Sequence, residues 1–420
     1  MKILQINILY KEKSTGRTCW EVEKALLAQG HSVLTAYGKG PKYASPYAYR
    51  IDTPLEYYIH NLLSRITGLQ GYFSYFATKR LIRKIKQFSP DVIHLRNLHA
   101  NYLNLPLLFK FLKEYNKPVI QNLHDLWAYT GKCAYYTVHN CHKFQQSCGN
   151  CKYLHQYPTS YFFDWTRKML KDKKKGYAGI KNLTIVGVSK WVKEQSQLSF
   201  FKGRPATYIY NWIDLNTFYP HPQSEHQQIK GKYGIAADKF IILGVSAGWT
   251  PGTIRYQDFL KLADRLPSTM QLVLIGRADK PFTHPKIHHI PFVSNLKDLS
   301  TLYSMADVFV HFSMEDTFGK VIAEAQACET PAVVYNSTAC PEIVGPECGF
   351  VAPPRDIDSV YRFITQLQSR EITCSGMRAW VEKNFNYKTN VAQLINLYKN
   401  LIGAAKTPDA TRGGAPHGNL

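Results

Sequence analysis

Short runs of apolar and β-branched residues recur along the chain, and segments of helical periodicity separate them. Strands that alternate with helices are typical of parallel sheets joined by crossover helices. The runs form two series. The first comprises residues 3–9, 33–37, 92–95, 119–123, 183–188 and 207–210, and the second comprises residues 240–245, 272–275, 287–293, 308–312 and 332–335. The pattern predicts an α/β protein with two Rossmann-like, doubly wound parallel-sheet domains.

A length of 420 residues agrees with two domains, because single hydrophobic cores stop growing at roughly 250 to 300 residues. We place the first domain at residues 1–215 and the second at residues 216–385, with a polar, proline-containing hinge around the boundary. Residues 386–403 have helical periodicity and predict a terminal helix. Residues 404–420, rich in Gly, Pro, Ala and Thr, predict a disordered tail. Ligands of such sheets bind beyond the carboxyl ends of the strands, so we expect the site in a cleft that faces both domains.

The sequence carries no membrane-spanning or secretory signal. No segment approaches the roughly 18 uncharged apolar residues that a spanning helix needs, which excludes an integral membrane protein. Polar residues interrupt the first seven positions and no small-residue cleavage site is evident, so the N-terminus is typical of a strand rather than a signal peptide. These features predict a cytoplasmic protein.

Positive charge is concentrated in the first half of the chain. The 32 basic and 12 acidic residues through Pro222 give +20 of the total charge of +22. Two basic clusters stand out, at residues 79–86 on an amphipathic helical pattern and at residues 167–175. Each cluster is either a solvated helix face or a surface for an anionic partner such as the membrane. Nucleic acid is not the expected partner, because no zinc-finger or ribonucleoprotein motif is present.

The most informative segment is residues 314–325, which follows an apolar run and opens a predicted helix. Asp316 and Thr317 occupy the expected N-cap position, and Gly319 allows the backbone to approach a ligand. The free N–H groups and positive dipole of a helix N-terminus can hold a diphosphate. Glu324, about two turns further on, could accept hydrogen bonds from ribose hydroxyls.

This segment resembles the signature of the family-four retaining glycosyltransferases of the GT-B fold. That signature is an acidic residue, seven residues and a Glu, followed by a small-residue helix end, Pro, an apolar strand and a Pro-Glu-Ile/Val turn. Here Asp316 and Glu324 supply the acidic pair, and residues 330–334 and 341–344 supply the later parts. The resemblance extends in weaker pieces over residues 1–402.

The resemblance implies a GT-B enzyme of the bacterial surface-polysaccharide type. Such an enzyme would move a sugar from a nucleotide-diphosphate donor to a glycan or lipid-pyrophosphate-linked acceptor, with retention of configuration, in polysaccharide, capsule or lipopolysaccharide biosynthesis. It would work in the cytoplasm or as a peripheral protein on the inner face of the cell membrane. The implied catalytic residues are His124, which follows the strand at residues 119–123, together with Asp316 and Glu324. The implied donor-binding residues are Gly16, Arg17, Arg255, Arg277, Thr317, Phe318, Gly319 and Lys320.

One departure from the family pattern concerns charge. Relatives carry an Arg and a Lys after the first strand of the second domain, and this chain offers only Arg255 or Arg277 as the diphosphate clamp. A metal-binding Asp-x-Asp motif is not evident, because Asp356-Ile357-Asp358 is typical of a helix cap. We therefore expect transfer to require no cofactor and no divalent metal.

Four of the nine cysteines lie close together in the sequence. Cys133, Cys141, Cys148 and Cys151 are spaced by seven, six and two residues. Four thiolates can close a tetrahedral zinc site, so these residues are candidate ligands of a structural zinc ion. Buried, unreactive thiols and a disulfide remain the alternatives.

Two other functions fit parts of the pattern. A sugar-nucleotide epimerase would keep the fold and change the reaction, but a small water-soluble substrate would not require the basic first half. A noncatalytic protein that binds membrane or nucleic acid would account for the incomplete clamp. Donor binding separates the enzymes from the noncatalytic protein.

Overall fold

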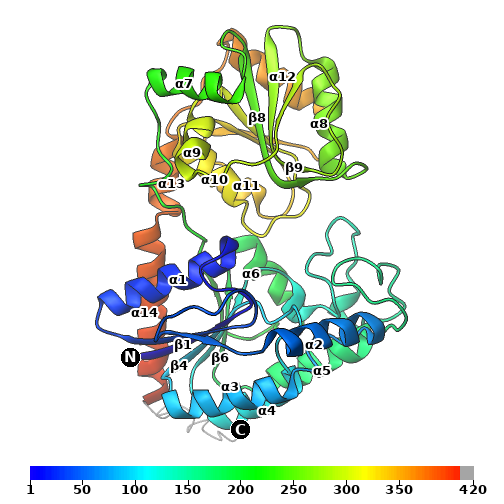
Figure 1. The fold of residues 1–420 in the computed structure, drawn as a ribbon, viewed down its shortest axis with the longest axis vertical. Coiled ribbons are helices and arrows are strands. Elements are labelled where there is room, and N and C mark those ends of the chain that lie inside the picture. Colours follow the sequence, from blue (N-terminus) through cyan, green and yellow to red (C-terminus); the bar gives the residue numbers. More distant parts are fainter. Residues whose placement is uncertain (407–420) are drawn as a thin grey trace, which may run out of the picture. The chain divides into compact units, whose positions relative to one another are not determined.

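The computed structural model describes residues 1–406, and most of the predicted disordered tail lies outside this range. Residues 404–406 belong to the last helix. The chain divides into two compact units (Figure 1). Unit 1 contains residues 1–188 and 192–209 and the described residues from Val391 onward, whereas unit 2 contains residues 189–191 and 210–390. Across the described residues, no helix is long and apolar enough to cross a membrane.

Unit 1 is built on a seven-stranded parallel sheet with the order β3-β2-β1-β4-β5-β6-β7. Its strands are β1 (Lys2–Asn7), β2 (Ser32–Tyr37), β3 (Ala48–Arg50), β4 (Val92–Leu95), β5 (Val119–Leu123), β6 (Leu183–Gly187) and β7 (Ala206–Tyr208). All residues of β4, β5 and β6 are buried, which explains why these strands are continuous apolar runs in the sequence. The order reverses between β1 and β4, so the carboxyl ends of these strands form a topological switch point.

The helices of unit 1 are α1 (Lys13–Ala28), α2 (Pro54–Thr67), α3 (Tyr75–Phe88), α4 (Leu105–Tyr115), α5 (Thr166–Ala178) and α6 (Lys190–Gln197), and the last begins in residues grouped with unit 2. Local sequence signals set several starts. Thr53 and Glu56 form a reciprocal capping box at α2, with Pro54 in the first turn. The Asn104 side chain accepts a hydrogen bond from the Leu107 N–H at the start of α4. Helix α4 packs against both α3 and α5.

Unit 2 contains a six-stranded parallel sheet with the order β10-β9-β8-β11-β12-β13. The strands are β8 (Phe240–Trp249), β9 (Met270–Ala278), β10 (Ile287–Ile290), β11 (Val308–His311), β12 (Ala332–Tyr335) and β13 (Gly349–Ala352). A core of buried apolar residues, including Ile242, Leu272 and Val310, lies against helices on the sheet. The switch point of this sheet lies between β8 and β11.

The helices that follow in the chain are α7 (Gln223–Tyr233), α8 (Ile254–Arg265), α9 (Leu296–Ser304), α10 (Lys320–Ala327), α11 (Cys340–Ile343), α12 (Ile357–Ser369), α13 (Met377–Asn384) and α14 (Tyr387–Lys406). Helix α14 starts in unit 2 and continues into unit 1. There the Tyr398 hydroxyl lies 2.6 Å from Nδ1 of the buried His94 in β4. This buried polar contact fixes the helix to the centre of the first sheet.

The predicted two-domain, parallel-sheet architecture is confirmed. The strands predicted at residues 92–95, 119–123 and 332–335 have the same bounds as the observed strands β4, β5 and β12. Two short strands, β3 and β13, were not expected from the sequence. Both lie at sheet edges and are partly exposed, so neither forms a continuous apolar run.

Candidate functional site

The segment that carries the acidic motif is a short loop between β11 and α10, at the switch point of the second sheet. Asp316 occupies its centre. The Gly319 N–H donates a 3.0 Å hydrogen bond to Asp316 Oδ1, and Asp316 Oδ2 lies 3.0 Å from His311 Nε2. The Asp316 N–H donates to the Thr338 hydroxyl at 3.0 Å. These contacts from three segments fix the orientation of the carboxylate.

Electrostatics keep this carboxylate ionised. Burial raises the pKa of Asp316, but the His311 ring, the Arg255 guanidinium and the Gly319 N–H lower it by more. The pKa therefore lies below its ordinary value. Burial also lowers the pKa of His311, despite the opposing effect of Asp316. Both pKa shifts agree with a neutral His311 imidazole whose Nε2–H donates to the ionised Asp316 carboxylate.

The predicted N-cap was wrong in detail. Helix α10 begins at Lys320, and its N-cap is Gly319 rather than Asp316 or Thr317. Gly319 has a φ of 80°, a left-handed conformation that a side chain would strain, and a Cβ there would lie 2.7 Å from Ile322 Cδ1. Asp316 still satisfies one of the N–H groups at this helix start through its bond to Gly319. The remaining first-turn amides keep the character of an anion site.

Arg255 lies beside Asp316, although the two come from different elements. It occupies the first turn of α8, and its guanidinium donates to the Ser246 and Ser313 hydroxyls at 2.6 and 3.2 Å. Its Nε atom is buried and has no hydrogen-bond partner among the described residues. Burial lowers the pKa of Arg255, while Asp316 opposes that shift. An incompletely paired buried cation is suited to an anionic ligand. Arg277, the other clamp candidate, lies exposed in β9.

The remaining motif residues have different surroundings. Glu324 in α10 is nearly buried, and the Tyr303 hydroxyl donates to its Oε2 at 3.2 Å. The Phe318 ring packs edge-to-face on Phe385 with centroids 5.4 Å apart, and Thr317 beside it is also buried. Lys320 is half-buried at the first position of α10.

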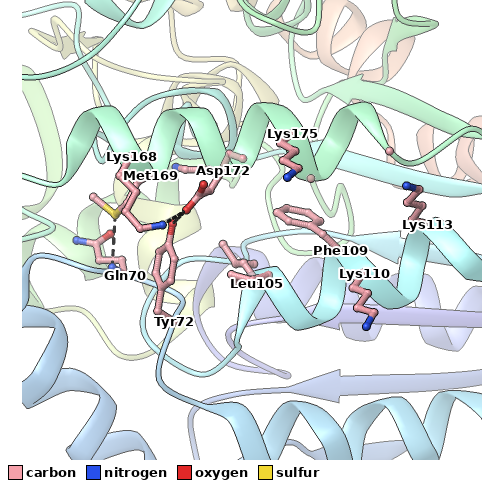
Figure 2. A pocket seen from close by; sticks show the side chains of 14 residues that line it. Gln70, Tyr72, Leu105, Phe109, Lys110, Lys113, Lys168, Met169, Asp172 and Lys175 are labelled. Atoms are coloured by element: carbon pink, nitrogen blue, oxygen red, sulfur yellow. Dashed lines mark hydrogen bonds and ion pairs between the residues drawn. The ribbon is translucent and has the colours of Figure 1, made fainter.

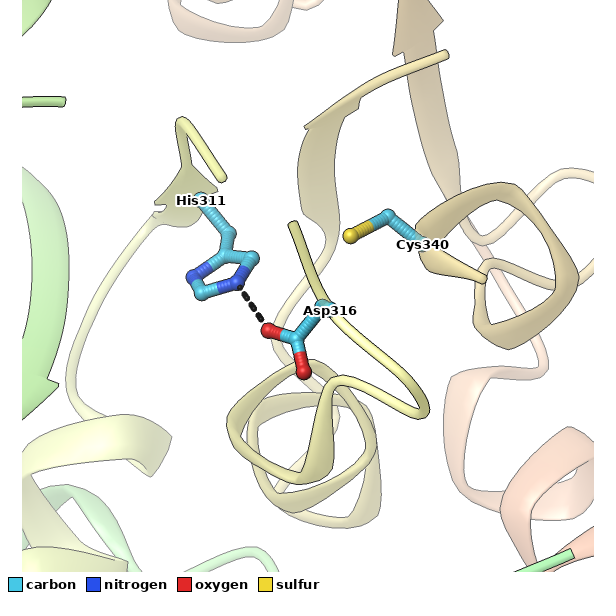
Figure 3. Close-up of side chains that lie close together, drawn as sticks. All are labelled: His311, Asp316 and Cys340. Atoms are coloured by element: carbon cyan, nitrogen blue, oxygen red, sulfur yellow. Dashed lines mark hydrogen bonds and ion pairs between the residues drawn. The ribbon is translucent and has the colours of Figure 1, made fainter. Parts of the chain in front are cut away.

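Figure 3 shows His311, Asp316 and Cys340 close together at this loop. They are the one set of three or more potential metal-ligand atoms within 4.8 Å of one another in residues 1–406. Burial raises the pKa of the Cys340 thiol well above its usual range, and Asp316 adds to that effect. A neutral thiol is a poor metal ligand, and Arg255 brings a positive charge to the same place. We therefore interpret His311 and Cys340 as residues that support Asp316 and not as ligands of a metal ion.

In unit 1, His124 directly follows β5, as the sequence predicted. Its Nε2 lies 3.3 Å from Arg96 Nη1, a buried side chain that follows β4. Burial, reinforced by the Arg96 charge, lowers the pKa of His124 to about 3. The imidazole is therefore neutral near pH 7 and can act as a hydrogen-bonding group.

A second polar cluster at this edge was missed in the sequence. His99 Nε2 lies 2.7 Å from Asp125 Oδ2, and the Asn97 amide donates to the same oxygen at 2.8 Å. Burial raises the pKa of Asp125, but His99 more than offsets it and the pKa lies below its ordinary value. His99 and Asn97 line a cavity of about 560 Å³, together with Tyr157. Asn97 and His99 lie just after β4, and Asp125 lies just after β5. These positions were the signal that could have identified the cluster.

Gly16 and Arg17, which the family resemblance implies as donor-binding residues, lie in the first part of helix α1. Gly16 is buried inside this helix, and a Cβ on it would lie 3.1 Å from Leu9 Cβ, so this glycine serves close packing. Arg17 is half-buried in the same turn. The residues of this segment that line the 560 Å³ cavity are Lys13, Ser14 and Thr15.

All nine cysteines are free, which removes the disulfide alternative. Cys133, Cys141, Cys148 and Cys151 line one cavity of about 270 Å³, with His139 and His142 beside them. Burial and the neighbouring Cys151 raise the pKa of Cys133 to about 12. The four sulfur atoms are not gathered as closely as the His311 set, so zinc is not established by the arrangement.

Comparison with known proteins gives matches in both units. Residues 15–217 match the sequence profile described as Glycosyltransferase Family 4, and residues 227–396 match that of Glycosyl transferases group 1. The colanic acid biosynthesis glycosyl transferase named WcaC, from Escherichia coli (strain K12), is 22% identical over 96% of this chain and 100% of its own length. The O-antigen chain mannosyltransferase B of Escherichia coli is 39% identical over 27% of this chain and 30% of its own.

Solved structures share the fold. Sucrose-phosphate synthase from Thermosynechococcus elongatus superposes with a TM-score of 0.66 at 19% identity, over 96% of this chain and 99% of its own. Anabaena HepE, solved in complex with UDP, gives a TM-score of 0.63 at 16% identity, over 95% and 100%. The two profiles, the two parallel sheets and these neighbours agree, and the chain belongs to the glycosyltransferases of the GT-B fold, with a family-four first half and a group 1 second half.

Proposed function

We propose that this glycosyltransferase moves a sugar from a nucleotide-diphosphate donor to a glycan or lipid-linked glycan acceptor, with retention of configuration. The observation that carries the proposal is the arrangement of Asp316, Arg255 and the α10 N-terminus around the switch point of the second sheet. HepE supports the donor class, since it was solved with UDP and with UDP-glucose. The names of the relatives support a role in surface-polysaccharide biosynthesis.

The donor diphosphate is the leaving group, and it gains negative charge as its bond to the sugar breaks. The backbone N–H of Lys320 would bind it together with the positive end of the α10 dipole. The Arg255 guanidinium, with its unpaired Nε, would supply the balancing charge in place of the usual Arg and Lys pair. Preorganised donors of this kind stabilise a leaving group without further rearrangement.

Three side chains complete the proposed chemistry. The ionised Asp316 would orient the donor sugar through its hydroxyls, and Glu324, held by Tyr303, would accept from the ribose. The neutral His124 would contact the sugar near the reacting carbon. These roles are carried over from the family resemblance and fit the protonation states described above.

Transfer by this set of residues would require no divalent metal. The Asp356 side chain accepts a 3.0 Å hydrogen bond from the Ser359 N–H at the start of α12, so this Asp-x-Asp segment is a helix cap. The cysteine cavity remains a candidate structural zinc site in unit 1. Zinc binding there would require the four thiols to lose their protons and move together.

We further propose that unit 1 binds the inner face of the cell membrane. Helix α2 carries its apolar side chains outward and buries polar His60 and Ser64 instead. Its exposed apolar residues are Leu55, Tyr58, Ile59, Leu62 and Ile66. Arg80 on α3 pairs with Glu56 on α2, which joins this apolar face to the basic cluster of α3. An apolar helix face beside lysines and arginines is typical of interfacial binding.

A thermal-shift panel of nucleoside diphosphates and their sugars tests the proposal, because a bound ligand raises the stability of the folded state. We expect one base to raise the melting temperature, and we expect Glu324→Gln to reduce that rise. Glu371→Gln, at an exposed position, is the matched control. The absence of a shift with every nucleotide would contradict the enzyme assignment. Epimerisation of free donor without acceptor would favour the epimerase.

The anomeric configuration is tested separately. Proton NMR of the product, compared with the donor, reports whether the configuration at the transferred carbon is kept. A product of opposite configuration would leave the transferase assignment intact and remove retention.

A further inference from the structure

An apolar cavity lies in unit 1 between α4 and α5, away from the residues assigned to the donor. Its volume is about 600 Å³, within the range of ligand pockets. Figure 2 shows α5 along one side, with Met169 and Asp172, and α4 along the other, with Leu105 and Phe109. We refer to this cavity as the α4–α5 groove.

The apolar lining of the groove comes from both helices. Leu105, Phe109 and Met169 are buried, yet they line the groove. Gly176 on α5 faces Phe109, and a Cβ there would lie 2.2 Å from Phe109 Cδ2. The missing side chain at position 176 therefore lets the ring lie against α5 and shapes the groove between the helices.

Positive charge surrounds this apolar lining. Lys110 and Lys113 on α4 and Lys168 and Lys175 on α5 line the groove with exposed side chains. Asp172 is the one acidic side chain among the residues that line it, and it already binds the Tyr72 hydroxyl and the Lys168 ammonium. Lysines without a matching number of carboxylates favour an anionic group at the rim.

The groove shares lining residues with two other hollows of unit 1. A basic depression of about 550 Å³ shares Lys168 and Asp172 with it and is also lined by Arg167 and Lys171. At the opposite side, Gln70 lines both the groove and the 560 Å³ cavity that contains His99.

We propose that the α4–α5 groove binds the hydrocarbon chain of a lipid that carries a phosphate group, with the rim lysines beside the phosphate. An apolar lining accounts for the chain, and the lysines account for the anionic head. This site goes beyond the proposed transfer reaction, because lipid binding here needs neither donor nor catalysis. A bound lipid would also anchor unit 1 at the membrane.

Short-chain phosphatidic acid, monomeric in water, tests the groove without a membrane surface. Calorimetric titration of the full chain should give one site for dioctanoyl phosphatidic acid. Dibutanoyl phosphatidic acid should bind at least about tenfold more weakly, since each buried CH₂ contributes to affinity. Equal binding of both lipids, or of inorganic phosphate, would show that only the head group is recognised and would overturn the proposal.

A matched pair of triple variants locates the binding. Lys110→Gln, Lys113→Gln and Lys175→Gln together should weaken dioctanoyl phosphatidic acid binding about tenfold or more. The control, Lys79→Gln, Lys84→Gln and Lys86→Gln on α3, removes the same charge outside the groove and should leave affinity unchanged. Equal loss in both variants would show nonspecific attraction to positive charge. The fold of either variant is checked by the circular dichroism and melting temperature of the full chain without ligand.

Discussion

The two units are built on the same kind of parallel sheet but differ in the surroundings of the carboxyl ends of their strands. In unit 2 the loop before α10 is closed by short contacts, and Asp316 is held by both His311 and Gly319. In unit 1 the corresponding edge borders a wide cavity lined by His99 and Lys13, in the half of the chain that carries nearly all of the net charge. The difference suggests that unit 2 holds one defined small ligand and unit 1 accommodates a larger and anionic one.

The largest effect is expected from Asp316→Asn. The amide keeps the size of the side chain but removes the charge that His311 and Arg255 stabilise, so we expect kcat to fall about 100-fold or more. Asp356→Asn, at the cap of α12, is the control and should leave kcat unchanged. Transfer at the wild-type rate by Asp316→Asn would remove this carboxylate from the mechanism.

A smaller loss is expected from Arg255→Gln. The variant removes the cation proposed to bind the donor diphosphate, so the dissociation constant for UDP should rise about 10- to 100-fold. Arg277→Gln at the exposed position on β9 should change it little. Isothermal titration measures both, and the reverse ranking would assign the clamp to Arg277.

His99→Gln tests whether unit 1 serves the acceptor. Loss of the ring that contacts Asp125 should lower kcat/KM for the acceptor about tenfold and leave UDP affinity unchanged. The matched variant His139→Gln changes an exposed contact in the cysteine region. If His99→Gln weakened UDP binding instead, the division of roles between the units would be wrong.

Acid should destabilise unit 1 through its buried histidines. Burial lowers the pKa of His60 to about 3, against about 6.5 in the unfolded chain. The stability from the neutral ring is complete above pH 6.5 and is lost as the pH falls toward 3, because the unfolded state binds the proton first. The slope is at most about 1.4 kcal/mol per pH unit for this group. His60→Gln should flatten the fall in urea unfolding between pH 6.5 and 4, and an unchanged slope would contradict the assignment.

The smallest effect is expected from chelation. EDTA should leave the transfer rate unchanged, because the proposed leaving-group stabilisation uses Arg255 and backbone amides. If the cysteine cavity of unit 1 holds zinc, a stronger chelator should lower the melting temperature and leave UDP binding intact. Loss of transfer without loss of folding would overturn the metal-independent mechanism.

The parts of the fold that the sequence predicted are those fixed by local patterns. The runs at residues 92–95 and 119–123 became β4 and β5 because every residue in them is buried. Strand β8 extends to Trp249, beyond the predicted end at residue 245, because the Ser, Ala and Gly residues that follow do not form an apolar run. Gly16, a donor-binding residue implied by the resemblance, lies within α1, where a Cβ would come 3.1 Å from Leu9 Cβ, and this close packing is not visible in the sequence.

The candidate site was predictable where one segment supplies it. Asp316, Gly319 and Glu324 belong to a single segment, and the resemblance of that segment to a family signature made them candidates. The contacts of Arg255 with Ser246 and Ser313 join residues as far as 58 positions apart, and sequence spacing does not contain this information. The same holds for His99 and Asp125, which meet only because β4 and β5 are neighbours.

Hydrogen exchange of the backbone amides at residues 317–322 tests the central claim most directly. We predict that UDP slows exchange at these amides, because the diphosphate binds them at the start of α10, whereas uridine without phosphates slows it much less. Unchanged exchange in saturating UDP, or equal slowing by uridine, would contradict the account.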